Sequence, residues 1–290
     1  MSERAPAKIN VCLFVGAARA ADGRHELVSV MQAVDLADEL RLEPAPADEV
    51  RCPGVEGPNI VAAAIAAFRA RTGWEGAPVR ITVTKRIPVA AGMAGGSADA
   101  AAALRLLARE AQLDDIALLR EIAASLGADV PAQVLPGRYL ATGAGERVEA
   151  LTPVWPGYVV LVLPSDGELS TPAVYREFDR LGLPRSPEEL GARLAEVRAA
   201  TGERRGRLPG ALVVNDLAPA AISLLPSVAE ALAHVREEGA GHALVSGSGP
   251  TVLGLFTDAG AARTAAQALR RHHPRLVLTE PVVAARGAPA

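Results

Sequence analysis

Alternation of hydrophobic and polar residues predicts strands in the first third of the chain. Residues 7–16, AKINVCLFVG, read as one strand, and residues 25–44, HELVSVMQAVDLADELRLEP, are expected to form two more, because apolar residues alternate with polar ones there. Pro44 ends that run, since proline cannot donate to a strand ladder. Residues 79–87, VRITVTKRI, alternate at a period of two and predict a further strand.

Helix signals are interleaved with these strands. Residues 59–72, NIVAAAIAAFRART, predict a helix with Asn59 as its N-cap and Gly73 just beyond its end. Strong helix formers predict another helix over residues 96–110, and a third is expected over residues 114–126. In the second half, similar signals predict helices at 171–181, 186–200, 213–225, 228–238 and 261–271, and strands at 242–246, 251–256 and 275–279.

The order of these elements indicates an α+β fold in two domains, with helices on one face of an antiparallel sheet. A boundary is predicted near residues 151–156, where LTPVWPG interrupts the pattern ahead of the buried-strand run YVVLVLP. The predicted domains are therefore residues 1–152 and residues 153–290. The tail ARGAPA, residues 285–290, is expected to be disordered.

Composition narrows the classes of function. The chain has 290 residues, 22% charged and 50% hydrophobic, and reads as a folded soluble protein of one large or two ordinary domains. A formal net charge of -3 without a basic block argues against a nucleic-acid partner. No secretory signal pattern is visible, and the longest apolar run, residues 60–68, is too short to span a membrane. Cys12 and Cys52 are too few for a disulfide framework or a four-ligand zinc site, which favours the reducing cytoplasm.

Lysine use is unusual. Of the 30 basic residues counted as Lys plus Arg, only Lys8 and Lys85 are lysines. A general bias toward arginine explains why arginines are so numerous. It does not explain where the two lysines stand, and their positions are either due to chance or related to function. Both lysines stand beside motif-like segments, where a compact ammonium with three donors differs from a flat guanidinium.

Glycines are crowded ahead of an alanine-rich helix in residues 85–104, KRIPVAAGMAGGSADAAAAL. Gly92, Gly95 and Gly96 would let the backbone approach a ligand closely, and the N–H groups at a helix start attract an anion. The spacing is not a dinucleotide fingerprint, and no lysine follows Gly96 as in a Walker-type loop. The alternative is that the glycines only allow tight packing of strand against helix.

Three further segments carry side chains suited to chemistry. PAKIN places Lys8 and Asn10 on the same face of the first strand. LGADVP, residues 126–131, puts Asp129 in a turn before a proline, where an aspartate is also an ordinary cap or turn former. SGSGPT, residues 246–251, is a second small-residue loop or a plain hairpin turn. Each of these segments is a weak signal alone.

Taken in this order, PAKIN, PVAAGMAGGSADAAA, LGADVP and SGSGPT resemble the three-motif pattern of the GHMP small-molecule kinases. DGRHEL, residues 22–27, and VNDL, residues 214–217, look like segments of the branch of that family whose substrate carries a cytidine diphosphate. The resemblance covers residues 6–256. It implies a two-domain α+β GHMP kinase fold, with a ribosomal-protein-S5-like N-terminal domain and a ferredoxin-like C-terminal α/β sandwich.

The resemblance also implies roles for single residues. The catalytic lysine and aspartate of the family fall on Lys8 and Asp129. The loop that binds the ATP phosphates falls on Pro88, Val89, Ala90, Ala91, Gly92, Met93, Ala94, Gly95, Gly96, Ser97 and Ala98. Ser97 is also the candidate ligand for Mg²⁺, which would bridge the phosphates.

For the substrate, the resemblance implies four contacts, at Asn10, Arg24, His25 and Tyr175. The family's cytosine-reading histidine falls on His25. Where the family has a tyrosine that stacks on the base, this sequence has Arg24, whose guanidinium plane can also lie on a base face. Lys85 has no implied role and is expected to be a solvated charge at the end of a strand.

The function expected from the resemblance is ATP- and Mg²⁺-dependent phosphorylation of the 2-hydroxyl of a cytidine-diphosphate-linked methylerythritol, in isoprenoid precursor synthesis by the non-mevalonate route. The partner would be this small-molecule substrate, with no nucleic acid and no membrane. One alternative is another GHMP kinase acting on homoserine, mevalonate or a sugar, which would not be expected to carry the DGxH segment. A second is a non-catalytic relative that only binds a metabolite, against which the pair Lys8 and Asp129 argues. The sequence leaves the oligomeric state open.

Overall fold

The computed structural model describes residues 1–89, 91–152, 159–163, 167–202 and 208–282, and divides the chain into two compact units that interleave along the sequence. Unit 1 consists of Met1–Lys8, Leu36–Val89 and Ala94–Pro136, and unit 2 of Ile9–Asp35, Ala90–Met93 and Gly137–Ala290. The predicted boundary between residues 152 and 153 stays a prediction, and residue 153 lies outside the described residues, as does the tail at 285–290.

Two long strands belong to both units, β1 (Ser2–Ala18) and β2 (His25–Pro44), and they pair with each other. The prediction of two strands in residues 25–44 was wrong, because one unbroken strand covers all twenty residues. No glycine or proline interrupts this stretch before Pro44, so the chain has no turn at which a hairpin could form.

Unit 1 is built on the second half of β2. This half pairs with β4 (Val79–Thr84) in antiparallel register from Glu39 opposite Thr84 to Pro44 opposite Val79. The short β3 (Glu49–Arg51) adds to β4 in parallel, so this sheet is mixed and differs from the antiparallel expectation. The helices of the unit are α1 (Ile60–Thr72), α2 (Gly95–Glu110), α3 (Ile116–Leu126) and α4 (Val130–Gln133).

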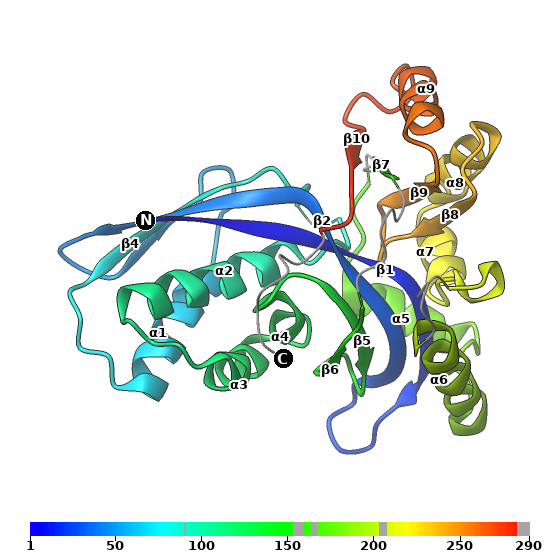
Figure 1. Cartoon of the computed structure of the whole chain (residues 1–290). Helices are drawn as coiled ribbons and strands as arrows, with labels where there is room; N and C mark the ends of the chain where they lie inside the picture. Colours follow the sequence, from blue (N-terminus) through cyan, green and yellow to red (C-terminus); the bar gives the residue numbers. More distant parts are fainter. Residues whose placement is uncertain (90, 153–158, 164–166, 203–207, 283–290) are drawn as a thin grey trace. The chain divides into compact units, whose positions relative to one another are not determined.

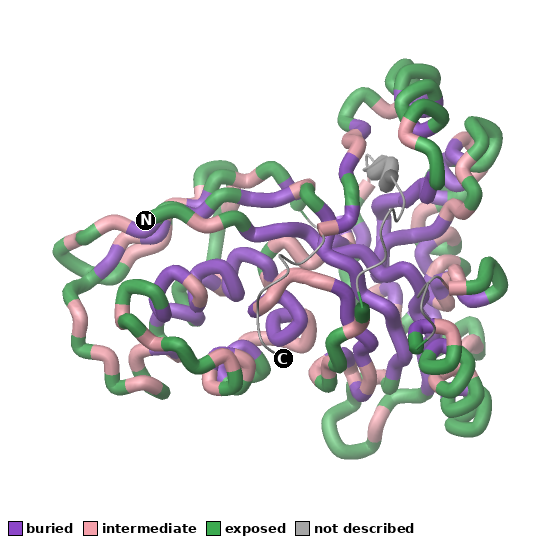
Figure 2. The backbone as a smooth tube through the Cα atoms, in the orientation of Figure 1, coloured by how far each residue is buried: buried purple, intermediate pink, exposed green. Residues whose placement is uncertain are grey.

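The core of unit 1 lies between these strands and helices (Figure 1). Buried residues run through the middle of α2, from Ala98 to Ala108 with Arg105 as the exception, and Figure 2 shows this buried stretch. Its run of alanines, residues 100–103, is fully buried, since small side chains let the backbones of neighbouring elements approach closely. Phe68 of α1, with Leu104 and Leu107 of α2, supplies the larger apolar side chains of this core.

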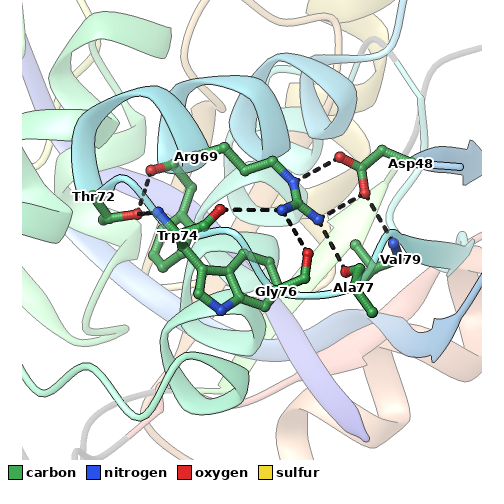
Figure 3. A network of polar contacts seen from close by, with 8 residues as sticks. Asp48, Arg69, Thr72, Trp74, Gly76, Ala77 and Val79 are labelled. Atoms are coloured by element: carbon green, nitrogen blue, oxygen red, sulfur yellow. Dashed lines mark hydrogen bonds and ion pairs between the residues drawn. The ribbon is translucent and has the colours of Figure 1, made fainter.

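A single arginine fixes the connection between α1 and β4 (Figure 3). Arg69 pairs with both oxygens of Asp48 at 2.7 and 3.1 Å, and donates to the carbonyls of Trp74, Gly76 and Ala77 at 3.2, 2.9 and 3.0 Å. Its guanidinium also lies 4.5 Å from the centroid of the Trp74 ring. All five donors of the guanidinium are therefore used, which holds the connecting loop in one conformation.

Unit 2 contains the first half of β2, which pairs with β5 (Arg138–Thr142), and β5 pairs in turn with β6 (Arg147–Ala150). A second sheet, antiparallel throughout, has the order β10-β7-β9-β8. Its strands are β7 (Val159–Leu163), β8 (His242–Val245), β9 (Val252–Phe256) and β10 (Val277–Thr279). The helices of the unit are α5 (Thr171–Arg180), α6 (Pro187–Gly202), α7 (Ala218–Leu224), α8 (Ser227–Glu237) and α9 (Ala259–Leu269), with a 3₁₀ turn η1 (Gly210–Leu212).

The predicted helix over residues 213–225 was wrong in its first part. Only α7 is α-helical, while residues 213–217 run alongside β1, with the amide of Leu13 donating to Val214 and that of Asp216 to Leu13. Asn215 and Asp216 bind backbone groups through their side chains, which competes with helix formation. The other predicted helices and strands are present within a few residues of their expected ends.

Candidate active site

Lys8 and Asp129 form an ion pair in unit 1. The Lys8 Nζ lies 3.3 Å from the Asp129 Oδ2, and the exposed fractions of the two side chains are 7% and 33%. Lys8 reaches this position from β1, and Asp129 stands at the N-cap of α4. A buried ammonium beside a partly open carboxylate orients that carboxylate while leaving it accessible to a ligand.

Contacts around α4 fix this pair. The Gln133 side chain donates to the carbonyl of Pro6 at 3.2 Å, and Arg105 of α2 donates to the carbonyl of Gln133 at 2.6 Å. Arg105 also donates to the carbonyl of Arg4 at 2.7 Å and pairs with Glu3 at 3.1 Å. The start of β1, just ahead of Lys8, is thereby bound to α2 and α4.

Among the described residues of the glycine-rich loop, two have left-handed backbone, Gly92 with a φ of 70° and Ala94 with a φ of 53°. Ala91 and Met93 are buried, and Gly92 between them is half-buried. In unit 2, the Gly92 carbonyl accepts a hydrogen bond of 3.0 Å from the Ser246 hydroxyl. A Cβ at Gly92 would lie 2.1 Å from the Ser246 carbonyl oxygen, so only glycine fits.

The start of α2 is suited to an anion. Its N-cap, Ala94, has no side-chain cap, and the first amide bonded within the helix is that of Ala98, which donates to Ala94 at 2.9 Å. The amides of Gly95, Gly96 and Ser97 are therefore available to phosphate oxygens at the positive end of the helix dipole. The Ser97 hydroxyl makes no hydrogen bond to any described residue, so its oxygen fits a ligand of Mg²⁺.

Lys85 is not a solvated charge at the strand end, so that prediction was wrong. Its Nζ lies 2.5 Å from Asp38 and 2.7 Å from Asp99, and its side chain is 16% exposed. Asp38, fully buried on β2, also accepts from the amides of Arg86 and Ile87 at 2.5 and 2.8 Å. The cluster of Asp38, Lys85 and Asp99 therefore joins the end of β4 to the first turns of α2, across the glycine-rich loop.

Burial sets the protonation of this cluster. It raises the pKa of Asp99 to about 7, although the Lys85 ammonium acts in the opposite direction. The two carboxylates raise the pKa of Lys85 against the effect of its own burial. One Asp99 oxygen, Oδ1, is buried without a hydrogen-bond partner among the described residues, which is consistent with a carboxyl that is readily protonated.

Asn10 lies next to residues 246–250, which we call the 246–250 loop. Its Nδ2 donates to the Ser29 hydroxyl at 2.7 Å, and that hydroxyl donates to the carbonyl of Cys12 at 2.6 Å. A Cβ at Gly247 would lie 3.6 Å from the Asn10 Oδ1 and 2.9 Å from the Gly92 carbonyl oxygen. In unit 2 the structure therefore brings Asn10, the Gly92 turn and the 246–250 loop together.

His25 lies against α5. Its Nε2 is 2.8 Å from the Asp179 Oδ1, and its ring centroid is 4.8 Å from that of Tyr175 and 6.3 Å from that of Phe178. Positions 175, 178 and 179 share one face of a helix, because residues three and four apart are neighbours on its surface. The structure thus brings His25 and Tyr175 together, as expected of one binding site.

Arg24 is exposed and does not stack on a described aromatic ring. Its guanidinium donates to the carbonyl of Ala144 at 3.4 Å, and its amide to Asp22 at 3.1 Å. Asp22 also pairs with Arg19, which lowers the pKa of that aspartate. The expected loop residue Ala90 lies outside the described residues.

Sequence reasoning missed Asp38 and Asp179, which complete these clusters. Asp179 had a usable signal, its spacing of four from Tyr175 in a predicted helix, whereas Asp38 had none, since it is one of several acidic residues in β2. Within the described part of the chain, no group of three histidine, cysteine or acidic side chains is arranged to hold a metal ion. No helix in the same ranges is long and apolar enough to cross a membrane.

Two family models match the chain. The GHMP kinases N terminal domain matches residues 59–137, and the GHMP kinases C terminal domain matches residues 197–275. The first match contains the glycine-rich loop and Asp129, and the second contains VNDL and the 246–250 loop.

Relatives with assigned names match over nearly the whole chain. A 4-diphosphocytidyl-2-C-methyl-D-erythritol kinase of Streptomyces avermitilis is 44% identical over 280 residues, with 92% of this chain and 91% of the relative covered. The protein of the same name from Streptomyces coelicolor is 45% identical over 280 residues, with the same coverage.

Solved structures agree on the fold. A crystal structure of 4-(cytidine 5'-diphospho)-2C-methyl-D-erythritol kinase has a TM-score of 0.75 at 33% identity, covering 97% of this chain and 99% of that chain. Homoserine kinase from Cytophaga hutchinsonii also reaches a TM-score of 0.75, at 19% identity and with 98% and 94% coverage, which shows the shared fold alone.

Proposed function

The chain belongs to the GHMP kinase family and is a small-molecule kinase, and from that premise we propose that it phosphorylates the 2-hydroxyl of 4-diphosphocytidyl-2-C-methyl-D-erythritol with ATP. The expected two-domain fold of the family is confirmed. The substrate is supported by the names and coverage of the relatives and by the cluster of His25, Tyr175 and Asp179.

The ion pair of Lys8 and Asp129 is the observation that carries the proposed reaction. Asp129 is the accessible partner and accepts the proton of the substrate hydroxyl as that oxygen attacks the γ-phosphorus. Lys8 orients the carboxylate and offsets the negative charge that develops on the phosphoryl oxygens. The bond from γ-phosphorus to the bridging oxygen breaks, leaving ADP.

The glycine-rich loop holds the phosphates of ATP in this proposal. The amides of Gly95, Gly96 and Ser97 donate to phosphate oxygens, and the left-handed turn at Gly92 keeps side chains away from them. The Ser97 hydroxyl would hold Mg²⁺, which, when bound, neutralises charge on the β- and γ-phosphates.

Recognition of the cytosine is assigned to His25, with Tyr175 as an aromatic wall and the exposed Arg24 as a further contact. Asn10 is the fourth contact and lies beside the 246–250 loop.

Two free cysteines support a reducing, cytoplasmic location, and burial raises the pKa of Cys12 to about 12, which keeps its thiol unreactive.

The test is an ADP-release assay of the purified protein with Mg²⁺ and ATP. The cytidyl substrate is assayed alongside homoserine, mevalonate and galactose, and the product is identified by ³¹P NMR. We expect turnover with the cytidyl substrate alone. Turnover with another acceptor would reassign the substrate within the family, and ADP release with none of the four would favour a binding protein.

A further inference from the structure

The segment VNDL, residues 214–217, contains Asn215, whose side-chain nitrogen and oxygen are both hydrogen-bonded. The Asn215 Nδ2 donates to the carbonyls of Val245 and Gly247, both at 2.7 Å, and its Oδ1 accepts from the amide of Leu217 at 2.9 Å. The residue is 8% exposed. An aspartate at this position could accept the hydrogen bond from Leu217 but could not donate to the two carbonyls, and an alanine could do neither.

The backbone that carries this amide is held firmly. The amide of Leu13 donates to Val214 at 2.8 Å, and that of Asp216 donates back to Leu13 at 2.9 Å. The Asp216 carboxylate accepts from the amide of Val15 at 3.0 Å and from two nitrogens of Arg185 at 2.6 and 2.7 Å. The backbone on both sides of Asn215 is therefore fixed to β1, while its side chain contacts the 246–250 loop.

The 246–250 loop in turn contacts the Gly92 turn. The Ser246 hydroxyl donates to the Gly92 carbonyl at 3.0 Å, and Gly247 packs so closely that a Cβ there would lie 2.9 Å from the same oxygen. Gly247 and Gly249 both have left-handed backbone, with φ of 55° and 79°, so the course of the loop is tightly specified. A shift of the Gly247 carbonyl would therefore displace the Gly92 carbonyl.

We propose that Asn215 is a positioning residue for the kinase: through the 246–250 loop it fixes the Gly92 turn, and so sets the affinity for ATP without contacting it. This inference rests on the proposed role of the glycine-rich loop. Loss of the amide leaves two buried carbonyls, those of Val245 and Gly247, without a donor, and such groups draw in water or move.

The experiment compares Asn215→Ala with Asp258→Ala, in full-length protein. Asp258 caps α9 through a 2.7 Å hydrogen bond from the amide of Ala261, so its loss lowers stability without touching the 246–250 loop. Calorimetry with a non-hydrolysable ATP analogue and with CMP, together with Tm, gives the readouts. We expect Asn215→Ala to lower the affinity for the ATP analogue by about 5- to 50-fold and the affinity for CMP by less than about 2-fold. Asp258→Ala should lower Tm and leave both affinities unchanged.

A conservative series separates positioning from general stability. Asn215→Asp keeps the acceptor but sets a carboxylate against two carbonyls, so it should weaken the ATP analogue at least as much as alanine. Ser246→Ala removes one hydroxyl, leaves Asn215 in place and should weaken the analogue in the same direction, which tests the proposal even where Asn215 variants do not fold. Unchanged affinity for the analogue in Asn215→Ala overturns the proposal, as does unchanged affinity in Ser246→Ala where the Asn215 variants do not fold. Equal loss of affinity for the analogue and for CMP overturns it as well. The affinity for the ATP analogue does not depend on which acceptor the wild-type enzyme phosphorylates. A wild-type protein that binds the analogue but not CMP would contradict the proposed substrate and leave the comparison of analogue affinities intact.

Discussion

The His25 Nε2 lies 2.8 Å from the Asp179 Oδ1, and this contact sets which ring nitrogen carries the proton. A carboxylate can only accept, so Nε2 donates and the Nδ1 of a neutral ring is an acceptor. Nδ1 makes no hydrogen bond to a described residue. An acceptor matches the 4-amino group of cytosine and not the 4-oxygen of uracil.

We therefore predict that His25→Ala weakens CMP by about 5- to 150-fold and abolishes the preference for CMP over UMP, while the affinity for an ATP analogue stays unchanged. Asp179→Asn should reduce the same preference less, because an amide can still accept from Nε2. Calorimetry gives the affinities, and ¹⁵N shifts of the ring report its tautomer. A wild-type protein that binds CMP and UMP equally well would contradict the assignment.

Asp129→Asn should lower kcat by about 10²–10⁴, the range for loss of a positioned general base, and leave the affinity for ATP nearly unchanged. The physical reason is that the amide keeps the size and the contact with Lys8 but cannot take a proton. Steady-state kinetics and nucleotide binding measure the two effects. Asp115→Asn is the matched control, since Asp115 caps α3 and asparagine caps equally well. Full turnover of Asp129→Asn would remove this residue from the mechanism.

Gly92→Ala should weaken ATP binding by at least about 10-fold, because the new Cβ would lie 2.1 Å from the Ser246 carbonyl oxygen at a φ of 70°. The Gly92 turn must then move, and the affinity for CMP should not change. Gly191→Ala in α6 is the control, with open space around its Cβ, and should stabilise the protein by about 0.5–1 kcal/mol. Equal loss of both ligands in Gly92→Ala would indicate misfolding rather than a displaced loop.

Asp99 should make stability fall as pH rises toward neutrality. Its pKa is about 7 in the folded chain, against an ordinary value of 3.8, so between these values the folded state holds a proton that the unfolded state has lost. The free energy of unfolding therefore decreases with pH across this window. Relative to wild type, Asp99→Asn should gain roughly 1–3 kcal/mol between pH 5 and pH 8. Urea unfolding at several pH values measures this, and parallel curves for the two proteins would refute the shift.

Arg69→Lys should destabilise unit 1 by about 2–4 kcal/mol, since an ammonium cannot replace five donors that hold Asp48 and three carbonyls of one loop (Figure 3). Arg71→Lys is the control: its ion pair with Glu121 is exposed, and the change should stay within about 0.5 kcal/mol. Thermal and urea unfolding measure the loss of stability in each variant. Equal losses in the two variants would contradict the prediction.

Much of this protein was predictable from sequence, because the signals are local. The helix α1 begins after Asn59, whose side chain accepts from the amide of Val61, and ends at Gly73 in left-handed conformation, as its cap residues indicated. The motifs around Lys8, Gly92 and Asp129 identified the family, which the comparisons confirm. The roles of the single site residues stay predictions, which the proposed substitutions test.

Only the tertiary structure showed which distant side chains share a site. Asp38 and Lys85 are 47 residues apart, and His25 and Asp179 are 154 apart, so no periodicity or spacing within one element relates them. The same holds for residues 213–217, whose apolar pattern allows a helix but whose backbone pairs with β1. A sequence pattern reports the conformation that neighbouring residues favour, whereas these choices depend on which partner reaches a buried charge or carbonyl once the chain has folded.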